Sequence, residues 1–240
     1  MKIFTLNDPV VRAIRADHPM LQGQKLIGSG QFSGVFEGVA PNTVLKLSID
    51  EASYKFHTRL KGHKSAKHFS RMTDDFGVVG TFTTSKNVTR TALSNPVELQ
   101  VPIFLYEVEK LGKIAPKTDN RKLAMRLTKD WRSIDHAALH EDYRERVGKI
   151  VSILADQDYY RSHPSVLQSL DFLAEFMLDY DGAFVDLHGA NMMQRDDGTF
   201  VFSDPVGDSR IYNSHFTFKP VTEITTQDMV RLKDEYNRVA

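Results

Sequence analysis

The sequence predicts an α+β protein in which a strand-rich first part is followed by a mainly helical second part. Short β-branched and aromatic runs, separated by glycine and proline turns, fill much of residues 25–111. Helix-forming patterns dominate residues 119–180. A chain of 240 residues is long enough for two small lobes around a cleft. We therefore expect a strand-rich N-terminal lobe at 1–110 and a helical C-terminal lobe at 111–240.

The first region begins with scattered apolar residues that predict a short helix within 1–22. A proline within the last predicted strand, Pro102, indicates that this strand lies at a sheet edge or bends. Residues 62–75 are polar and are predicted to form a loop. The predicted strands are 25–27, 35–39, 43–47, 77–84 and 97–111, and a helix is predicted at 50–61.

The second region has helical periodicity through 119–160 and again through 165–180, where apolar residues recur on one face. A strand is predicted at 182–188, and residues 192–193 and 200–202 are predicted to pair around a turn at 196–198. A last helix is predicted at 226–238.

The composition excludes several classes of protein. Lys plus Arg and Asp plus Glu both number 31, so no net charge favours direct binding of nucleic acid or of an anionic membrane. Cysteine is absent, which excludes disulfides and thiolate zinc sites. Residues 1–21 lack the apolar core of a signal peptide, and no apolar run is long enough to span a bilayer. We expect a cytoplasmic protein, and the sequence specifies no oligomeric state.

Three polar residues of the second region have an informative spacing: Asp186, Asn191 five residues later, and Asp204 thirteen residues after that. This spacing is typical of sites that transfer a phosphoryl group, where one carboxylate receives the acceptor proton and two oxygen ligands hold Mg²⁺. Asp and Asn also favour ordinary turns, which explains Asp196 and Asp197 equally well. The preference for turns does not explain why two apolar runs end at Asp186 and Asp204.

A glycine-rich segment lies between two predicted strands of the first region. Gly28, Gly30 and Gly34 are spaced one residue wider than the Gly-x-Gly-x-x-Gly loop whose backbone amides cover phosphates, and Val35 follows directly. Dinucleotide-binding folds have a similar glycine-rich loop, but they place a helix after the glycines, whereas a strand is predicted here. A plain hairpin turn is the simpler alternative.

The third predicted strand carries Lys46 among apolar residues. Such a lysine usually lies at a sheet edge with its ammonium group in water. The order of glycine segment, lysine and later carboxylates instead favours a lysine that binds nucleotide phosphates. The tripeptide Asp75-Phe76-Gly77 spells a metal-binding motif, but it precedes the candidate catalytic loop, and we interpret it as a loop-to-strand turn.

Together these segments resemble the protein-kinase-like superfamily, and most closely the early serine/threonine protein kinases of short-tailed bacteriophages. The resemblance covers residues 25–207, although only about thirty positions carry it. It implies a two-lobed fold with a reduced helical lobe, ATP and Mg²⁺ as cofactors, and host proteins as substrates. It also implies roles for individual residues. Asp186, Lys46 and His188 would be catalytic; Asn191 and Asp204 would hold the metal; Gly28, Ser29, Gly30, Phe32, Ser33, Gly34, Val35, Lys46 and the backbone near Glu107 and Glu109 would bind ATP.

Several positions depart from the kinase pattern. Val185 stands where an arginine often precedes the catalytic Asp, His188 replaces the usual lysine, and Pro205 replaces phenylalanine. Two other functions therefore stay open. One is a kinase of small molecules of the aminoglycoside or choline type, which shares Asp186, His188 and Asn191. The other is a pseudokinase-like protein that sequesters a host factor.

Four basic residues, Lys61, Lys64, Lys67 and Arg71, cluster outside these motifs. A cluster of this kind is usually a solvated face. The alternative is a surface that contacts an acidic partner.

Overall fold

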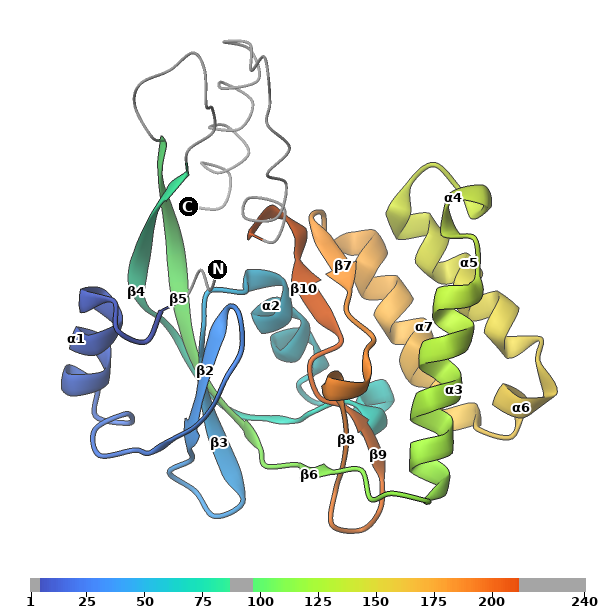
Figure 1. The fold of residues 1–240 in the computed structure, drawn as a ribbon, viewed down its shortest axis with the longest axis horizontal. Coiled ribbons are helices and arrows are strands. Elements are labelled where there is room, and N and C mark those ends of the chain that lie inside the picture. Colours follow the sequence, from blue (N-terminus) through green and yellow to red (C-terminus); the bar gives the residue numbers. More distant parts are fainter. Residues whose placement is uncertain (1–4, 87–96, 212–240) are drawn as a thin grey trace. The chain divides into compact units, whose positions relative to one another are not determined.

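The computed structural model describes residues 5–86 and 97–211 and has an α+β fold (Figure 1). The chain forms two compact units. The first contains the residues up to Glu51, residues Thr73–Val108 and the chain from Asp208; the second contains Ala52–Met72 and Glu109–Gly207. Neither unit is continuous in sequence, which differs from the simple division at residue 110 that we predicted.

The first unit is built on a five-stranded antiparallel sheet with the order β1-β2-β3-β5-β4. Gly34 pairs with Leu47, and Phe36 pairs with Leu45. Phe36, Leu45 and Leu47 are fully buried, and they join the buried face of a short helix in one hydrophobic core. The elements are α1 (Pro9–Asp17), β1 (Leu26–Ser29), β2 (Ser33–Glu37), β3 (Thr43–Ser48), β4 (Met72–Lys86) and β5 (Val97–Glu109).

Three predictions for this region are wrong in detail. Residues 62–75 are not a continuous loop, because they contain the 3₁₀ helix η1 (Lys64–His68) and the start of β4. The segment Asp75–Gly77 lies inside β4, where Gly77 has a φ of 68° and donates its N–H to Asp75 Oδ1 at 2.9 Å. The edge position predicted as one alternative for Pro102 is wrong, since β5 lies between β3 and β4, while the bend stays a prediction; proline removes only one donor from the ladder.

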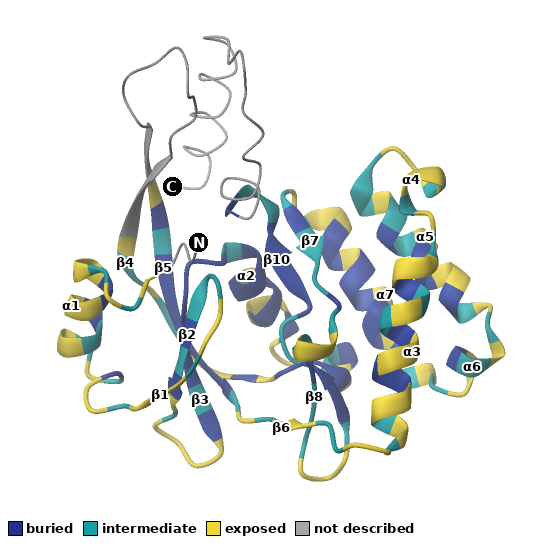
Figure 2. Ribbon diagram, in the orientation of Figure 1, coloured by how far each residue is buried: buried dark blue, intermediate teal, exposed yellow. Residues whose placement is uncertain are grey.

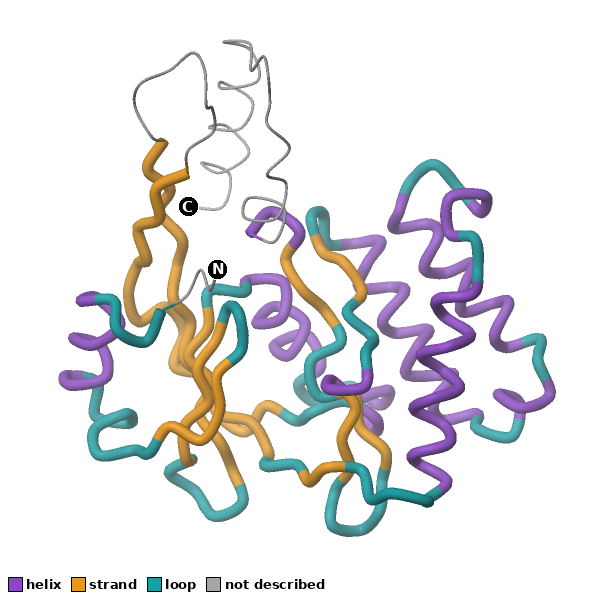
Figure 3. The backbone as a smooth tube through the Cα atoms, in the orientation of Figure 1, coloured by secondary structure: helices purple, strands orange, loops and turns teal. Residues whose placement is uncertain are grey.

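The second unit is mainly helical, and most of the helix in Figure 3 belongs to it. Its short strands form a three-stranded sheet, β6-β8-β9, and a pair, β10-β7. The elements are α2 (Glu51–Leu60), β6 (Gly112–Lys113), α3 (Asp119–Ser133), α4 (His136–Leu139), α5 (Tyr143–Ala155), α6 (Asp158–Arg161), α7 (Pro164–Asp179), β7 (Ala183–Val185), η2 (Gly189–Asn191), β8 (Met192–Gln194), β9 (Phe200–Phe202) and β10 (Val206–Asp208).

Aromatic packing joins distant segments of this unit. The ring of Phe56 on α2 lies 4.9 Å from that of Phe69 and 5.0 Å from that of Phe176 on α7, both edge to face. Figure 2 shows α7 buried along much of its length. The amphipathic helix predicted at 165–180 is therefore confirmed, and the turn predicted at 196–198 is also present, with Gly198 at a φ of 81°.

No helix in the described ranges is long and apolar enough to cross a membrane. The helix predicted at 226–238 lies outside the described residues.

Candidate functional site

The loop that carries Asp186 begins where β7 ends and is held by its own hydrogen bonds. The N–H of Asn191 donates to the carbonyl of His188 at 2.9 Å, and the N–H of Ala190 donates to Nδ1 of His188 at 3.2 Å. This closes the short helix η2, which leads directly into β8. The local geometry therefore fixes the position of Asn191 relative to Asp186.

The Asp186 carboxylate meets two neighbours on this loop. Asn191 Nδ2 donates to Asp186 Oδ2 at 3.0 Å, and His188 Nε2 lies 3.5 Å from the same oxygen. Burial raises the pKa of the Asp186 carboxyl, and the charge of Asp204 raises it further; His188 and the Asn191 hydrogen bond act in the opposite direction without cancelling the effect. A carboxylate with a raised pKa accepts a proton more readily than an ordinary Asp.

The segment around Asp204 is hydrogen-bonded to the same loop on both sides. Ser203 N–H donates to the carbonyl of Asn191 at 2.8 Å, and Asp186 N–H donates to the carbonyl of Pro205 at 2.8 Å. These two bonds bracket Asp204 and hold it beside the Asp186 loop. The three polar residues singled out by their spacing thus come together within the second unit.

Two further residues support this arrangement and were not found from the sequence. Ser53 on α2 donates its hydroxyl to Asp204 Oδ1 at 2.6 Å. Tyr143, at the start of α5, accepts the N–H of Val185 at 3.0 Å. Burial raises the pKa of Tyr143, so the hydroxyl stays neutral beside the carboxylate loop. The available sequence signal was the position of Ser53, three residues before Phe56. This spacing places Ser53 on the same buried helix face as Phe56.

The donor set is compatible with Mg²⁺, which favours oxygen ligands and usually takes only one or two protein carboxylates beside phosphates and water. The described hydrogen bonds of the Asn191 side chain both use Nδ2, which leaves Oδ1 for a cation. In the described ranges no three His, Asp or Glu side chains form a group suited to a metal ion. A cation here would complete its ligands with water or phosphate oxygens.

The glycine-rich segment lies in the first unit as a tight β1–β2 hairpin. Gly30 N–H donates to the carbonyl of Ser33 at 2.8 Å, and Ser29 pairs with Gly34. A strand follows the glycines, which excludes the strand-to-helix arrangement of a dinucleotide-binding loop. At Gly34 a Cβ would lie 2.8 Å from Leu6 Cδ2, so a larger residue there would require the end of the Leu6 side chain to move. The other positions predicted to bind ATP, Gly28, Phe32 and Val35, lie on the same hairpin.

Lys46 lies on β3, between β2 and β5, so it is not on an edge strand. It is only 8% exposed, and its Nζ lies 5.8 Å from the centroid of the Tyr106 ring. The alternative of an edge lysine with its ammonium group in water is therefore wrong. Lys46 belongs to the first unit, whereas Asp186, His188, Asn191 and Asp204 belong to the second.

Glu107 has a structural role that the sequence did not reveal. Its Oε1 accepts from Val39 N at 2.8 Å, from Ala40 N at 3.3 Å and from Thr43 Oγ1 at 2.7 Å, and its Oε2 accepts from Thr73 Oγ1 at 3.1 Å. Burial alone would raise the pKa of this carboxyl, but the four hydrogen bonds together hold the pKa below its ordinary value.

Glu109 likewise uses its polar groups within its own unit. Its carboxylate pairs with Arg195, with Nη2 at 2.7 Å from Oε1 and Nε at 2.8 Å from Oε2. Its N–H donates to the carbonyl of Arg71 at 2.9 Å. The amide of Glu109 is thus engaged within the protein, and the nucleotide contact predicted for the backbone near Glu107 and Glu109 stays a prediction.

Comparisons with known protein families, curated proteins and solved structures found no match to this chain. The functional argument therefore rests on the geometry around Asp186 and on the order of the motifs.

Proposed function

We propose that the protein transfers the γ-phosphoryl group of ATP, with Mg²⁺, to serine or threonine hydroxyls of other proteins. The observation that supports this best is the bracketing of Asp204 by the Asp186–Asn191 loop, with one backbone hydrogen bond of 2.8 Å on each side. A base, an amide oxygen and a second carboxylate are thereby grouped where two segments of the second unit meet. A structural turn does not require that combination.

In this proposal Asp186 receives the proton of the acceptor hydroxyl while the oxygen of that hydroxyl forms a bond to the γ-phosphorus. The bond between the γ-phosphorus and the bridging oxygen breaks, and that oxygen leaves with ADP. The raised pKa of Asp186 favours the proton transfer, and Asn191 Nδ2 orients the receiving carboxylate at 3.0 Å. His188 would lie next to the transferred group, within 3.5 Å of the Asp186 carboxylate.

Asn191 Oδ1 and the Asp204 carboxylate would hold Mg²⁺, with Ser53 orienting Asp204 through its 2.6 Å hydrogen bond. The ion would neutralise charge on the phosphates when bound. Lys46 would pair with the phosphates, and the β1–β2 hairpin would cover them. Lys46 is buried on an interior strand beside the ring of Tyr106, and not at a sheet edge, which supports this assignment.

The acceptor class follows from the resemblance to phage kinases, which implies host proteins in the cytoplasm of an infected bacterium. The second candidate is a small-molecule kinase. The contact between His188 Nε2 and Asp186 Oδ2 at 3.5 Å favours it, because aminoglycoside- and choline-type kinases share this histidine.

The test is incubation of the full chain with ATP labelled at the γ-phosphate, Mg²⁺ and a bacterial lysate. We expect labelled protein bands whose phosphoamino acids are serine and threonine. Asp186→Asn, which keeps the size of the side chain but removes the base, should abolish the label.

Three outcomes separate the candidates. Bands that persist at full intensity in Asp186→Asn would refute the assigned base. Label confined to small molecules would favour the second candidate. Nucleotide binding without any transfer would favour the pseudokinase-like alternative and refute the proposed enzyme.

A further inference from the structure

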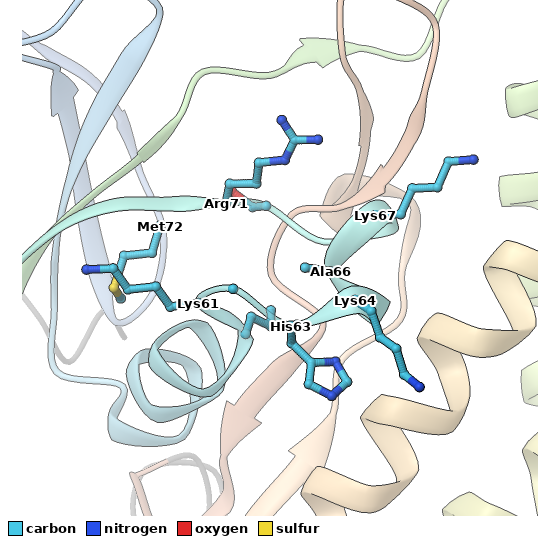
Figure 4. A pocket seen from close by; sticks show the side chains of 10 residues that line it. Lys61, His63, Lys64, Ala66, Lys67, Arg71 and Met72 are labelled. Carbon is cyan, nitrogen blue, oxygen red and sulfur yellow. The ribbon is translucent and has the colours of Figure 1, made fainter.

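A basic pocket of about 480 Å³ lies in the second unit, between the end of α2 and the start of β4 (Figure 4). Lys61, Lys64, Lys67 and Arg71 line it, with His63 between them. The lining includes no Asp or Glu and none of the residues assigned to phosphoryl transfer.

These four cations are exposed, and none of them forms an ion pair within residues 5–86 and 97–211. Other arginines of the same unit are paired: Arg59 with Asp179 at 2.6 Å, and Arg144 with Asp142 at 2.7 Å. Arg71 contributes to lowering the pKa of Asp197, which lies on an exposed turn, but does not pair with it. The positive charge of the pocket is therefore largely uncompensated by the described part of the protein.

The backbone that carries the pocket is held rigidly. Arg195 donates to the carbonyls of Lys67 at 2.6 Å and Phe69 at 2.9 Å while it pairs with Glu109. Glu109 Oε1 also accepts the N–H of Arg71 at 2.9 Å. This largely buried pair fixes the backbone between Lys67 and Arg71, so a ligand would not have to order the backbone that carries these two cations.

The opposite side of the pocket is fixed as well. His63 Nδ1 accepts the N–H of Ser65 at 3.2 Å, and its ring lies 4.6 Å from that of Phe172 on α7. The hydroxyl of Ser169 donates to the carbonyl of Ser65 at 3.0 Å. The short helix η1 is thereby held against α7.

The distribution of charge indicates the shape of the ligand. In Figure 4 the side chains of Lys61 and Lys67 extend toward opposite sides, and Arg71 and Lys64 extend in two further directions. A single phosphate cannot contact all four, whereas an extended chain with several carboxylates can. The lining also includes Leu60, Ala66 and Met72, which suit an apolar side chain.

Nucleic acid fits less well. No Phe, Tyr or Trp lines the pocket, so bases would have no aromatic ring on which to stack. A net charge of zero also provides no long-range attraction for a polyanion.

We propose that this pocket binds an extended acidic peptide segment of a partner protein, with Asp and Glu side chains on the four cations and one apolar side chain among Leu60, Ala66 and Met72. The proposal does not depend on phosphoryl transfer, because it assigns a binding surface separate from Asp186.

The test is fluorescence anisotropy of the full chain with a labelled peptide in which four acidic residues flank a central leucine. We expect saturable binding that weakens as salt rises, since exposed charges are screened. The same peptide with Asn and Gln in place of Asp and Glu should bind about tenfold more weakly or not at all.

The variant Lys67→Glu with Arg71→Glu should weaken binding by about tenfold or more. The matched control is Lys129→Glu with Arg132→Glu, which reverses two exposed charges of α3 that form no described ion pair and should leave the affinity unchanged. Circular dichroism and thermal melting confirm that both double variants fold. Asp186→Asn should bind the peptide as the wild type does, which separates this proposal from the proposed function.

Equal affinity in the two double variants would overturn the proposal, as would absence of binding at low salt. Competition by inorganic phosphate at concentrations similar to those of the peptide would also overturn it. If a labelled single-stranded RNA bound more tightly than the peptide, and the variant Lys67→Glu with Arg71→Glu lost that affinity, the ligand would be nucleic acid and the proposal would be wrong.

Discussion

Two carboxylates, one in each unit, show opposite behaviour. Glu107 on β5 is 5% exposed and has a pKa below its ordinary value, whereas the Asp186 side chain is 40% exposed and has a raised pKa. Burial alone would predict the reverse order, because removal from water disfavours the charged form.

The difference lies in the donors. Four hydrogen bonds from backbone and hydroxyl groups reach Glu107, and together they outweigh the effect of burial. Asp186 has the Asn191 amide and His188 near its carboxylate, and the negative charge of Asp204 opposes them. The saturated carboxylate of Glu107 stabilises the sheet, while the less satisfied carboxylate of Asp186 is free to exchange a proton.

The largest effect expected from this comparison is on activity. Asp186→Asn should lower phosphoryl transfer by about 10²- to 10⁴-fold, the range of general base catalysis. Its free energy of unfolding should change little, because few donors lose a partner. Steady-state rates with labelled ATP and urea denaturation measure the two effects, with exposed Asp181→Asn as the control. Global unfolding of Asp186→Asn would show that this carboxylate is structural after all.

Removal of Glu107 should act on stability instead. Glu107→Ala should lower the free energy of unfolding by about 1 to 3 kcal/mol, because four donors lose a shared acceptor, although the Thr43 hydroxyl can still donate to the carbonyl of Ala40 at 2.7 Å. Chemical denaturation tests this. Glu37→Ala removes an exposed carboxylate from the same sheet and should change the free energy by less than about 0.5 kcal/mol. Equal losses in the two variants would contradict the role assigned to Glu107.

The pH dependence of stability provides a smaller and more specific effect. The folded pKa of Glu107 lies below its ordinary value of 4.5, so its contribution is fully present above pH 4.5 and is lost as the pH falls through the folded pKa. Wild type should therefore exceed Glu107→Gln in stability at neutral pH, and the difference should shrink below pH 4.5. Denaturation curves at several pH values measure it, and a constant difference would refute the assignment.

The smallest effect is expected at Ser53. Ser53→Ala removes the 2.6 Å hydrogen bond to Asp204, so the Mg²⁺ concentration for half-maximal activity should rise about three- to tenfold, with little change at saturating Mg²⁺. Exposed Ser152→Ala on α5 is the matched control. An unchanged Mg²⁺ dependence would remove Ser53 from the site.

Local patterns predicted the elements well. The strands of the β1–β2–β3 region, the helix after them and the α7 face follow from periodicity and turn residues, and the spacing of Asp186, Asn191 and Asp204 identified a group that the fold does bring together. These signals work because they depend on neighbours close in sequence.

The missed features depend on distant partners. Ser53 and Asp204 are 151 residues apart, and Glu107 meets Val39, Ala40 and Thr43 across 64 to 68 residues. No periodicity encodes such contacts. The error at Pro102 has the same origin, since strand order in a sheet is a property of the whole fold.

The two units alternate along the chain. Residues 52–72 of the second unit lie between segments of the first, and residues 73–108 of the first unit lie between segments of the second. During synthesis on a ribosome, Phe56 emerges more than a hundred residues before its partners Phe172 and Phe176. The core of the second unit therefore cannot close until Phe176 has been translated. A fragment cut at residue 110 would expose the aromatic face of α2, so truncated expression products should aggregate rather than fold as independent lobes.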